Sequence, residues 1–346
     1  MKKNIGFIPV GQGGGNIGYL FEEAGYNALY LNTSEEDLAT LSKAKHKHHI
    51  KGGEGCHKDR DKAKILIKND FKEIMKKVEQ TLEEEYLFVI FTTGGGTGSG
   101  CSPMLIDLLT RRTNKTVGAI CVLPSREEPL KTFINSYEAF KELEEIKRIG
   151  ATFVLDNAKF EKFSLNKDFV DLFNSFIEIP TQQSYKGNID VAEIKEMLST
   201  RGAAIISKMT KATSDTSRLI QSFSQNKFAP LQQDEVITYI GLSAATPIEV
   251  SAITKEVGTC LDIFQGINAE NTICGLFGLT YPYSELEQMK VKIDGNKAAI
   301  TKNLTATSEK KLAEGINFLN EIRKPEANQI EPEEDMDDVF SKYLNK

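Results

Sequence analysis

The chain has 346 residues, more than one average domain needs, and its 40% hydrophobic and 27% charged residues are typical of a globular protein. Its formal net charge of −6 argues against a protein whose surface is covered by nucleic acid. The segment from Pro325 to Lys346 carries −5 of this charge, so the chain from Met1 to Lys324 is nearly neutral.

We find neither a signal peptide nor a membrane-spanning segment in the amino-acid sequence. The apolar stretch at the N-terminus is too short for a signal peptide, and no apolar run approaches the roughly 20 residues of a membrane span. The five cysteines are odd in number and form no CxxC pair. We therefore expect a cytoplasmic protein with reduced thiols, without a disulfide framework, a zinc site or a membrane partner.

The N-terminal part of the chain, from Met1 to about Phe160, alternates between short apolar runs and longer helical patterns. Runs that are β-branched or aromatic predict buried strands at residues 5–10, 28–31, 86–91, 117–123 and 151–155. Helical patterns predict helices at residues 16–23, 61–84, 103–112 and 131–148, and the second and fourth of these have apolar residues at three- and four-residue spacing. This alternation predicts an α/β fold with a Rossmann-like parallel sheet covered by helices on both faces.

A second, smaller α+β unit is expected after a helix at about residues 166–179. Its predicted strands are residues 203–207, 236–242 and 272–281, and its predicted helices are residues 248–261 and 308–322. The expected divisions are 1–165 for the N-terminal domain, 166–187 for a central helix and connection, 188–322 for the C-terminal domain, and 323–346 for a disordered acidic tail.

Two glycine clusters each follow a predicted strand and precede a predicted helix. In the first, Gly11 to Gly18, the spacing Gly13-x-Gly15-x-x-Gly18 matches the dinucleotide fingerprint, but the next strand ends on Asn32-Thr33 rather than on a ribose-binding acid. The second, Gly94-Gly95-Gly96-Thr97-Gly98-Ser99-Gly100, lacks the Lys-Ser/Thr pair of a Walker A loop. Glycine amides and two hydroxyls at the start of a helix favour a phosphate group.

Residues 94–100 are letter for letter the GGGTGSG signature of tubulin and FtsZ, and this chain resembles that superfamily, most closely its phage and plasmid branch. The resemblance implies a GTPase that binds GTP or GDP with Mg²⁺. It assigns nucleotide contacts to the two glycine loops, and Gln12 to a position beside phosphate, where it reaches the metal through water. The implied nucleotide-binding residues are Gly11, Gln12, Gly13, Gly14, Gly15, Asn16, Asn32, Gly53, Gly94, Gly95, Gly96, Thr97, Gly98, Ser99, Gly100, Glu128, Asn157 and Asn174.

Several of these assignments depend on individual motifs of the family. Residues 32–38 resemble the second loop, with Ser34 in place of the usual aspartate, and residues 52–55 resemble the loop that senses the γ-phosphate. Glu128 corresponds to the acid that holds the ribose, and Asn157 to an asparagine that contacts guanine or sugar. Asn174 corresponds to the central-helix asparagine that reads guanine.

Residues Asn188 to Glu193 resemble the synergy loop of the family, written N-x-D-x-x-D/E. By this resemblance Asn188, Asp190 and Glu193 enter the nucleotide pocket of the next subunit, where the two acids orient or activate water. The same two acids also have the spacing of an N-cap and a first-turn acid, and the two roles are compatible.

The C-terminal end has apolar residues at helical spacing, Met336, Val339, Phe340, Tyr343 and Leu344. We expect a short amphipathic helix that docks either on its own body or on a partner, although an inert tail is the alternative. The four histidines, at 46, 48, 49 and 57, have no standard metal-site spacing and are expected in a solvated basic loop.

The favoured interpretation is a filament-forming GTPase that polymerises head to tail. Its filaments would move plasmid or phage DNA through a DNA-binding adaptor, without direct nucleic-acid binding, in the cytoplasm of a bacterial host. The alternatives are a Rossmann-type oxidoreductase, a cell-division protein of the FtsZ type, and a regulatory protein that binds nucleotide without hydrolysing it.

Overall fold

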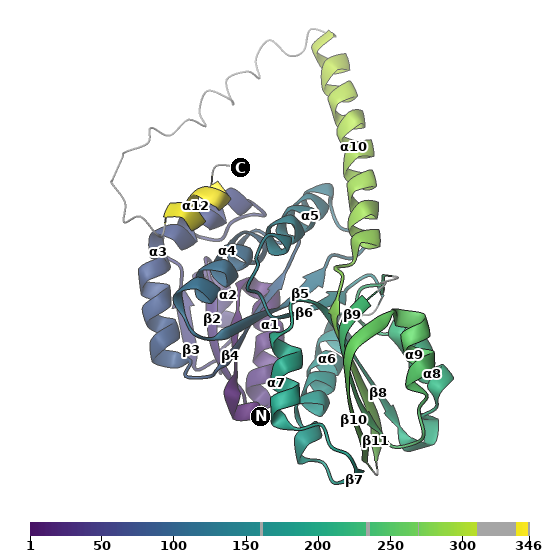
Figure 1. Cartoon of the computed structure of the whole chain (residues 1–346). Coiled ribbons are helices and arrows are strands. Elements are labelled where there is room, and N and C mark those ends of the chain that lie inside the picture. The colour runs from purple at the N-terminus through teal and green to yellow at the C-terminus, as the bar shows by residue number, and fades with distance from the viewer. Residues whose placement is uncertain (160–161, 233–235, 269, 310–336, 345–346) are drawn as a thin grey trace.

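The N-terminal half of the molecule is a parallel sheet between two layers of helices (Figure 1). The computed structural model describes residues 1–346 except 160–161, 233–235, 269, 310–336 and 345–346. The first six strands have the order β3-β2-β1-β4-β5-β6 and are all parallel. They are β1 (Ile5–Pro9), β2 (Asn27–Asn32), β3 (His46–His49), β4 (Tyr86–Thr92), β5 (Thr116–Leu123) and β6 (Ala151–Asp156).

The sheet continues without a break into the C-terminal half. Strand β8 pairs parallel to β6, and the order then runs β8-β11-β9-β10-β7 with mixed directions. The bounds are β7 (Ser184–Lys186), β8 (Gly202–Thr210), β9 (Val236–Ala244), β10 (Thr259–Asn268) and β11 (Asn271–Leu279). Within the described residues, the strands of both halves therefore belong to one eleven-stranded sheet.

The helices connect the strands and cover the sheet. In the N-terminal half they are α1 (Gly11–Glu23), α2 (Glu35–Thr40), α3 (Arg60–Thr81), α4 (Thr97–Arg112), α5 (Leu130–Glu144) and α6 (Lys162–Ile177). The C-terminal half has α7 (Val191–Ser199), α8 (Thr216–Gln225), α9 (Val250–Val257), α10 (Tyr283–Glu309) and α12 (Asp337–Leu344), and short 3-10 turns lie at 2–4, 179–181 and 211–213. None of the described helices is both long enough and apolar enough to cross a membrane.

Helix α6 joins the two halves through the phenylalanine stripe that its sequence predicts. Phe169, Phe173 and Phe176 are fully buried. The Phe173 ring centroid lies 5.9 Å from that of Phe7 on β1, and the Phe176 centroid lies 5.2 Å from that of Phe277 on β11. One helix thus packs on strands of both halves, which makes the molecule one continuous core.

Helices α1 and α4 begin inside the glycine clusters, earlier than the sequence pattern predicts. Glycine has low helix propensity, so its runs indicate loops in a sequence. Here tight packing explains them: a Cβ on Gly14 would lie 2.2 Å from the backbone oxygen of Ile90, and one on Gly100 would lie 2.7 Å from that of Arg60. The glycines let helix backbones approach a strand and a neighbouring helix.

The C-terminal half differs most from its predicted elements. The expected helix 248–261 ends at Val257. Gly258, with a φ of 105°, leads into strand β10, which lies between β9 and β7 and which the sequence did not predict. Helix α10 begins at Tyr283, well before the expected helix 308–322, most of which lies outside the described residues. As expected, all five cysteines are free.

Candidate functional site

The candidate site is a cavity of about 300 Å³ at the carboxyl ends of β1, β4, β5 and β6. In an open parallel sheet a ligand binds at these ends, next to the point where the strand order reverses, which here lies between β1 and β4. The cavity is lined by Gln12, Gly13, Asn16, Ile17, Lys58, Thr92, Gly94, Gly95, Val122, Leu123, Pro124, Glu128, Thr132, Asn157 and Asn166. Predicted residues from both glycine loops and from the segments after β5 and β6 therefore meet in one place.

The first glycine loop contributes the amino end of α1 to this cavity. Gln12, Gly13 and Asn16 line it, whereas Gly11, Gly14 and Gly15 are packed behind. The helix begins at Gly11 without a side-chain cap, so its first amides have no acceptor within the helix. A helix start of this kind favours an anionic ligand.

The second glycine loop contributes the amino end of α4. Gly94 and Gly95 line the cavity, and α4 begins at Thr97, again without a side-chain cap. The hydroxyls of Thr97 and Ser99, expected as phosphate donors, are engaged with the protein: Thr97 Oγ1 lies 2.7 Å from Thr33 Oγ1, and Ser99 Oγ donates to the Gly95 carbonyl. Gly96, Gly98 and Gly100 pack against neighbouring backbone. The backbone of this loop, rather than its hydroxyls, faces the cavity.

Thr33, in the loop of residues 32–38, forms hydrogen bonds with the loop of residues 52–55 and with the second glycine loop, residues 94–100. Besides Thr97, its hydroxyl lies 3.3 Å from Cys56 Sγ, and its carbonyl accepts from Gly55 N at 3.0 Å and from His49 Nε2 at 3.2 Å. Asn32 is buried and donates to Asp37 Oδ2, so Asn32 holds the loop rather than lining the cavity. Gly53 also lies outside the cavity lining; its carbonyl accepts from His49.

The sequence analysis missed Lys58, which supplies a cation to the cavity. Its Nζ donates to Thr132 Oγ1 at 2.6 Å, and its φ of 60° is in the left-handed region, as is that of His57. Such backbone strain in non-glycine residues is common at functional sites. Asn135 on α5 braces the same region by donating to the carbonyls of Lys58, Gly94 and Gly95. No motif marks Lys58 in the sequence.

The cavity lining also includes Glu128, Asn157 and Asn166. The first two are predicted site residues, and the third belongs to α6. Asn174, the predicted reader of guanine, lies two turns further along the same helix and is not part of the cavity lining; its side-chain oxygen is buried without a hydrogen-bond partner. The segment that carries Glu128 is held by α10, because Lys292 Nζ donates to the Arg126 carbonyl at 2.8 Å and lies 3.8 Å from the Phe133 ring centroid.

Comparison with known proteins decides the family. Residues 4–164 match the GTPase domain of the tubulin/FtsZ family. Over 99% of its length, the chain is 31% identical to the whole of the tubulin-like protein TubZ of a Clostridium botulinum phage. This chain belongs to the tubulin/FtsZ family. The crystal structure of TubZ from C. botulinum phage c-st superposes with a TM-score of 0.78 at 28% identity, covering 86% of this chain and 100% of that one. A GTPγS-form protofilament of TubZ from Bacillus thuringiensis shares the fold, with a TM-score of 0.73 at 17% identity, covering 87% of this chain and 94% of that one.

Membership of the tubulin/FtsZ family makes this chain a GTPase, and the structural match confirms the fold class predicted from the alternating strands and helices and from the family resemblance. The starts of α1 and α4, neither of which has a side-chain cap, lie at the same cavity.

The predicted synergy-loop acids of this tubulin/FtsZ chain lie far from its own cavity. Asp190 caps α7, and Asp190 and Glu193 form a reciprocal capping box with N–O distances of 2.8 and 2.9 Å. Helix α7 contacts the amino ends of the strands, where Lys195 pairs with Glu85, just before β4. The hydrogen bond that Lys195 donates to the Glu85 carboxylate raises the pKa of Lys195. The cavity begins at the opposite end of β4, at Thr92. This strand has seven residues, so the cavity lies about 20 Å from Glu85.

The histidine-rich segment has structural partners. His48 Nε2 lies 2.6 Å from Asp70 Oδ2, and His49 bonds two carbonyls as described above. Within the part of the chain that the structure describes, no three His, Cys, Asp or Glu side chains are grouped as metal ligands would be.

Proposed function

We propose that this GTPase binds GTP or GDP in the cavity between its two glycine loops and polymerises head to tail. The observation that carries the proposal is the placement of the two halves of the site at opposite ends of one sheet: the cavity lies at the carboxyl ends and Asp190 and Glu193 lie beyond the amino ends. A copy stacked end on end would bring one half against the other. Solved structures of TubZ relatives, which include a protofilament and a two-stranded filament, support this arrangement.

Hydrolysis in this proposal requires the next subunit. Phosphoryl transfer depends on positioned water and charge stabilisation more than on a covalent catalyst. The amides at the starts of α1 and α4, together with Lys58, suit the phosphates, and the acids of the neighbour would orient the water. Because Asp190 and Glu193 lie away from the cavity of their own chain, a monomer would bind GTP without rapid turnover.

We also propose Mg²⁺ as the metal that accompanies the nucleotide. Mg²⁺ prefers oxygen ligands and keeps several waters and phosphate oxygens in its shell. Gln12 is the cavity-lining side chain at the amino end of α1, and its amide oxygen suits a water-mediated contact to the ion. The ion would neutralise charge that develops between the two terminal phosphates.

Asn166, rather than Asn174, is the proposed reader of guanine. Asn166→Ala should weaken GTP binding by about 1–3 kcal/mol, because a buried base edge would lose its hydrogen-bond partner. The matched control Asn174→Ala should leave affinity within about threefold, since Asn174 lies outside the cavity lining. Titration of each variant with a fluorescent GTP analogue measures both. Loss of affinity in the Asn174 variant alone would restore the assignment made from sequence.

Polymerisation is tested by sedimentation with GTP, GDP or NADH. The chain should pellet with GTP, and phosphate release per subunit should rise steeply with protein concentration, because the active site is completed by contact between copies. A specific activity that stays constant at all protein concentrations would contradict hydrolysis in trans. Oxidation of NADH to NAD⁺ would instead favour the dinucleotide alternative.

For the cellular role we propose movement of plasmid or phage DNA through a DNA-binding adaptor. The resemblance to the TubZ of a phage supports this role. The nearly neutral charge of the chain from Met1 to Lys324 favours an adaptor over direct contact, because direct binding depends on neutralising many phosphates. Retention of a plasmid that carries the gene would fall when hydrolysis is blocked.

A further inference from the structure

The C-terminal helix α12 is docked on the body of its own chain, against α3 and α4 (Figure 1). Its anchor is Tyr343, which is only 2% exposed. The ring lies below the ammonium group of Lys64, and the hydroxyl donates to Asp107 Oδ2 at 3.4 Å, with the Pro103 carbonyl at 3.5 Å. Burial, together with the charge of Asp107, raises the pKa of Tyr343, so the hydroxyl remains a donor. Tyr343 is therefore packed as a core residue is, not as a surface side chain.

Lys64, Pro103 and Asp107 enclose Tyr343, and we call them its socket. The socket contacts other groups of α12 besides the tyrosine ring. Lys342 Nζ lies 3.1 Å from Asp107 Oδ2, and that carboxylate is itself almost fully buried. The Tyr343 carbonyl accepts from Lys64 Nζ at 3.1 Å. A cation, an aromatic ring and a backbone carbonyl of the helix are thus each matched by a group of the body. Such complementarity indicates a binding site for this segment rather than a chance contact.

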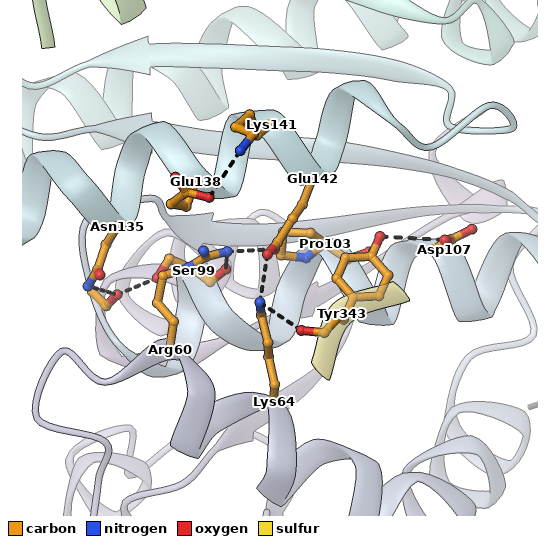
Figure 2. Close-up of polar contacts among 11 residues, drawn as sticks. Arg60, Lys64, Ser99, Pro103, Asp107, Asn135, Glu138, Lys141, Glu142 and Tyr343 are labelled. Atoms are coloured by element: carbon orange, nitrogen blue, oxygen red, sulfur yellow. Dashed lines mark hydrogen bonds and ion pairs between the residues drawn. The ribbon is translucent and has the colours of Figure 1, made fainter. Parts of the chain in front are cut away.

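Buried polar groups connect this socket to the second glycine loop, residues 94–100 (Figure 2). Lys64 Nζ also donates to Glu142 Oε1 at 2.7 Å, and Glu142 Oε2 accepts from Arg60 at 2.5 Å. Arg60 in turn donates to the carbonyl of Ser99 at 3.1 Å. The chain of contacts therefore runs from the Tyr343 carbonyl to the second glycine loop, and all of its side chains are at least nine-tenths buried.

We propose that the face formed by α3, α4 and α5 is a docking site for helix 337–344 of the same chain, and that its occupancy controls nucleotide release through Lys64, Glu142 and Arg60. The second part rests on the proposed nucleotide site. When the helix leaves, Lys64 loses an acceptor and water reaches Glu142, so Arg60 is held less firmly on the Ser99 carbonyl. Undocking therefore speeds the release of GDP.

The occupant is the chain's own helix, because residues 310–336 tether it to the body. Within one chain this contact is intramolecular, and its effective concentration exceeds that of a separate copy in dilute solution. The helix meets Asp107 with its cation, Lys342.

Docking is tested with the full-length Tyr343→Ala chain, whose socket is open, and a fluorescent peptide of residues 333–346. Anisotropy should show that the peptide binds this variant, that a peptide carrying Tyr343→Ala binds at least tenfold more weakly, and that the wild-type chain binds little because its own helix occupies the site. A Tyr343→Phe peptide, which keeps the ring, should bind within about threefold of the native one. Equal binding to wild type and variant would refute the intramolecular occupant, and no binding to either would refute the site.

The coupling is tested by stopped-flow release of a fluorescent GDP below the polymerisation concentration. Tyr343→Ala should release GDP about three- to tenfold faster, and saturating native peptide should restore the wild-type rate. Peptide binding with an unchanged release rate would overturn the coupling and leave the docking site. If wild type and variant both fail to bind fluorescent GDP, the proposed nucleotide site fails instead, independently of the peptide result.

Discussion

Glu193→Gln should abolish most GTP hydrolysis while leaving the fold and the filament intact. Glu193 has two possible roles, a first-turn acid that completes the capping box of α7 and a carboxylate that acts on water in the next subunit. Glutamine separates them: its amide oxygen can still accept the Asp190 N–H, as Glu193 Oε2 does at 2.8 Å, but it has no charge and no basicity. If the carboxylate acts on water, phosphate release should fall about 100-fold or more.

Filaments of the Glu193→Gln variant should be longer than those of wild type, because disassembly follows hydrolysis in the proposed mechanism. Phosphate release, electron microscopy and thermal denaturation are measured on the same preparation. The melting temperature should stay close to that of wild type, since the cap is retained. Asp190→Asn, which also keeps a capping oxygen, provides a second measurement. Normal turnover in both variants would leave these acids with a capping role only.

The parallel half of the fold could be predicted from sequence because its strands are buried on both faces. Runs such as Leu87–Phe91 and Val117–Leu123 are continuously apolar, which is typical of a sheet covered by helices. Strand β10 lacks this signal. It lies near the sheet edge, and Leu261 is 71% exposed while neighbouring polar residues share its surface, so no regular alternation identifies a strand.

Helix α10 escaped prediction for a related reason. Apolar periodicity appears where a helix buries one face, and much of α10 extends away from the body (Figure 1). Among the described side chains of this helix, only the first turns bury an apolar stripe, formed by Leu286, Met289 and Ile293, whereas Val291 and Ile300 are at least half exposed. Its contact with the site depends on Lys292, a residue whose cationic side chain carries no pattern that indicates a buried contact.

The glycine loops illustrate what a motif can and cannot predict. GGGTGSG indicated the family and a phosphate-binding loop, and Gly94 and Gly95 line the cavity. The motif did not show that Thr97 and Ser99 hydrogen-bond to protein groups, because Thr33 comes from a loop 64 residues earlier. Likewise Asn166 and Asn174 are equivalent as sequence features of one helix, and only their positions along its axis distinguish them.

Gly14→Ala should destabilise the protein by about 3 kcal/mol or more and abolish nucleotide binding. The added methyl group would lie 2.2 Å from the Ile90 carbonyl oxygen, 3.0 Å from its carbon and 3.3 Å from the Phe91 Cα. All three are backbone atoms of β4, so no side chain can rotate away and α1 must move off the sheet. Because α1 begins three residues earlier, this movement displaces the helix start that faces the cavity.

Gly295→Ala is the matched control for that substitution. Gly295 lies within α10, and a Cβ there would meet no atom within 4 Å. Since alanine is the better helix former, this variant should gain up to about 1 kcal/mol. Thermal or urea denaturation measures the stability of both variants, and a fluorescent GTP analogue measures binding. If Gly14→Ala binds nucleotide and unfolds like wild type, the close approach of α1 to β4 is not required, and the glycines of the first loop must be explained by ligand contact alone.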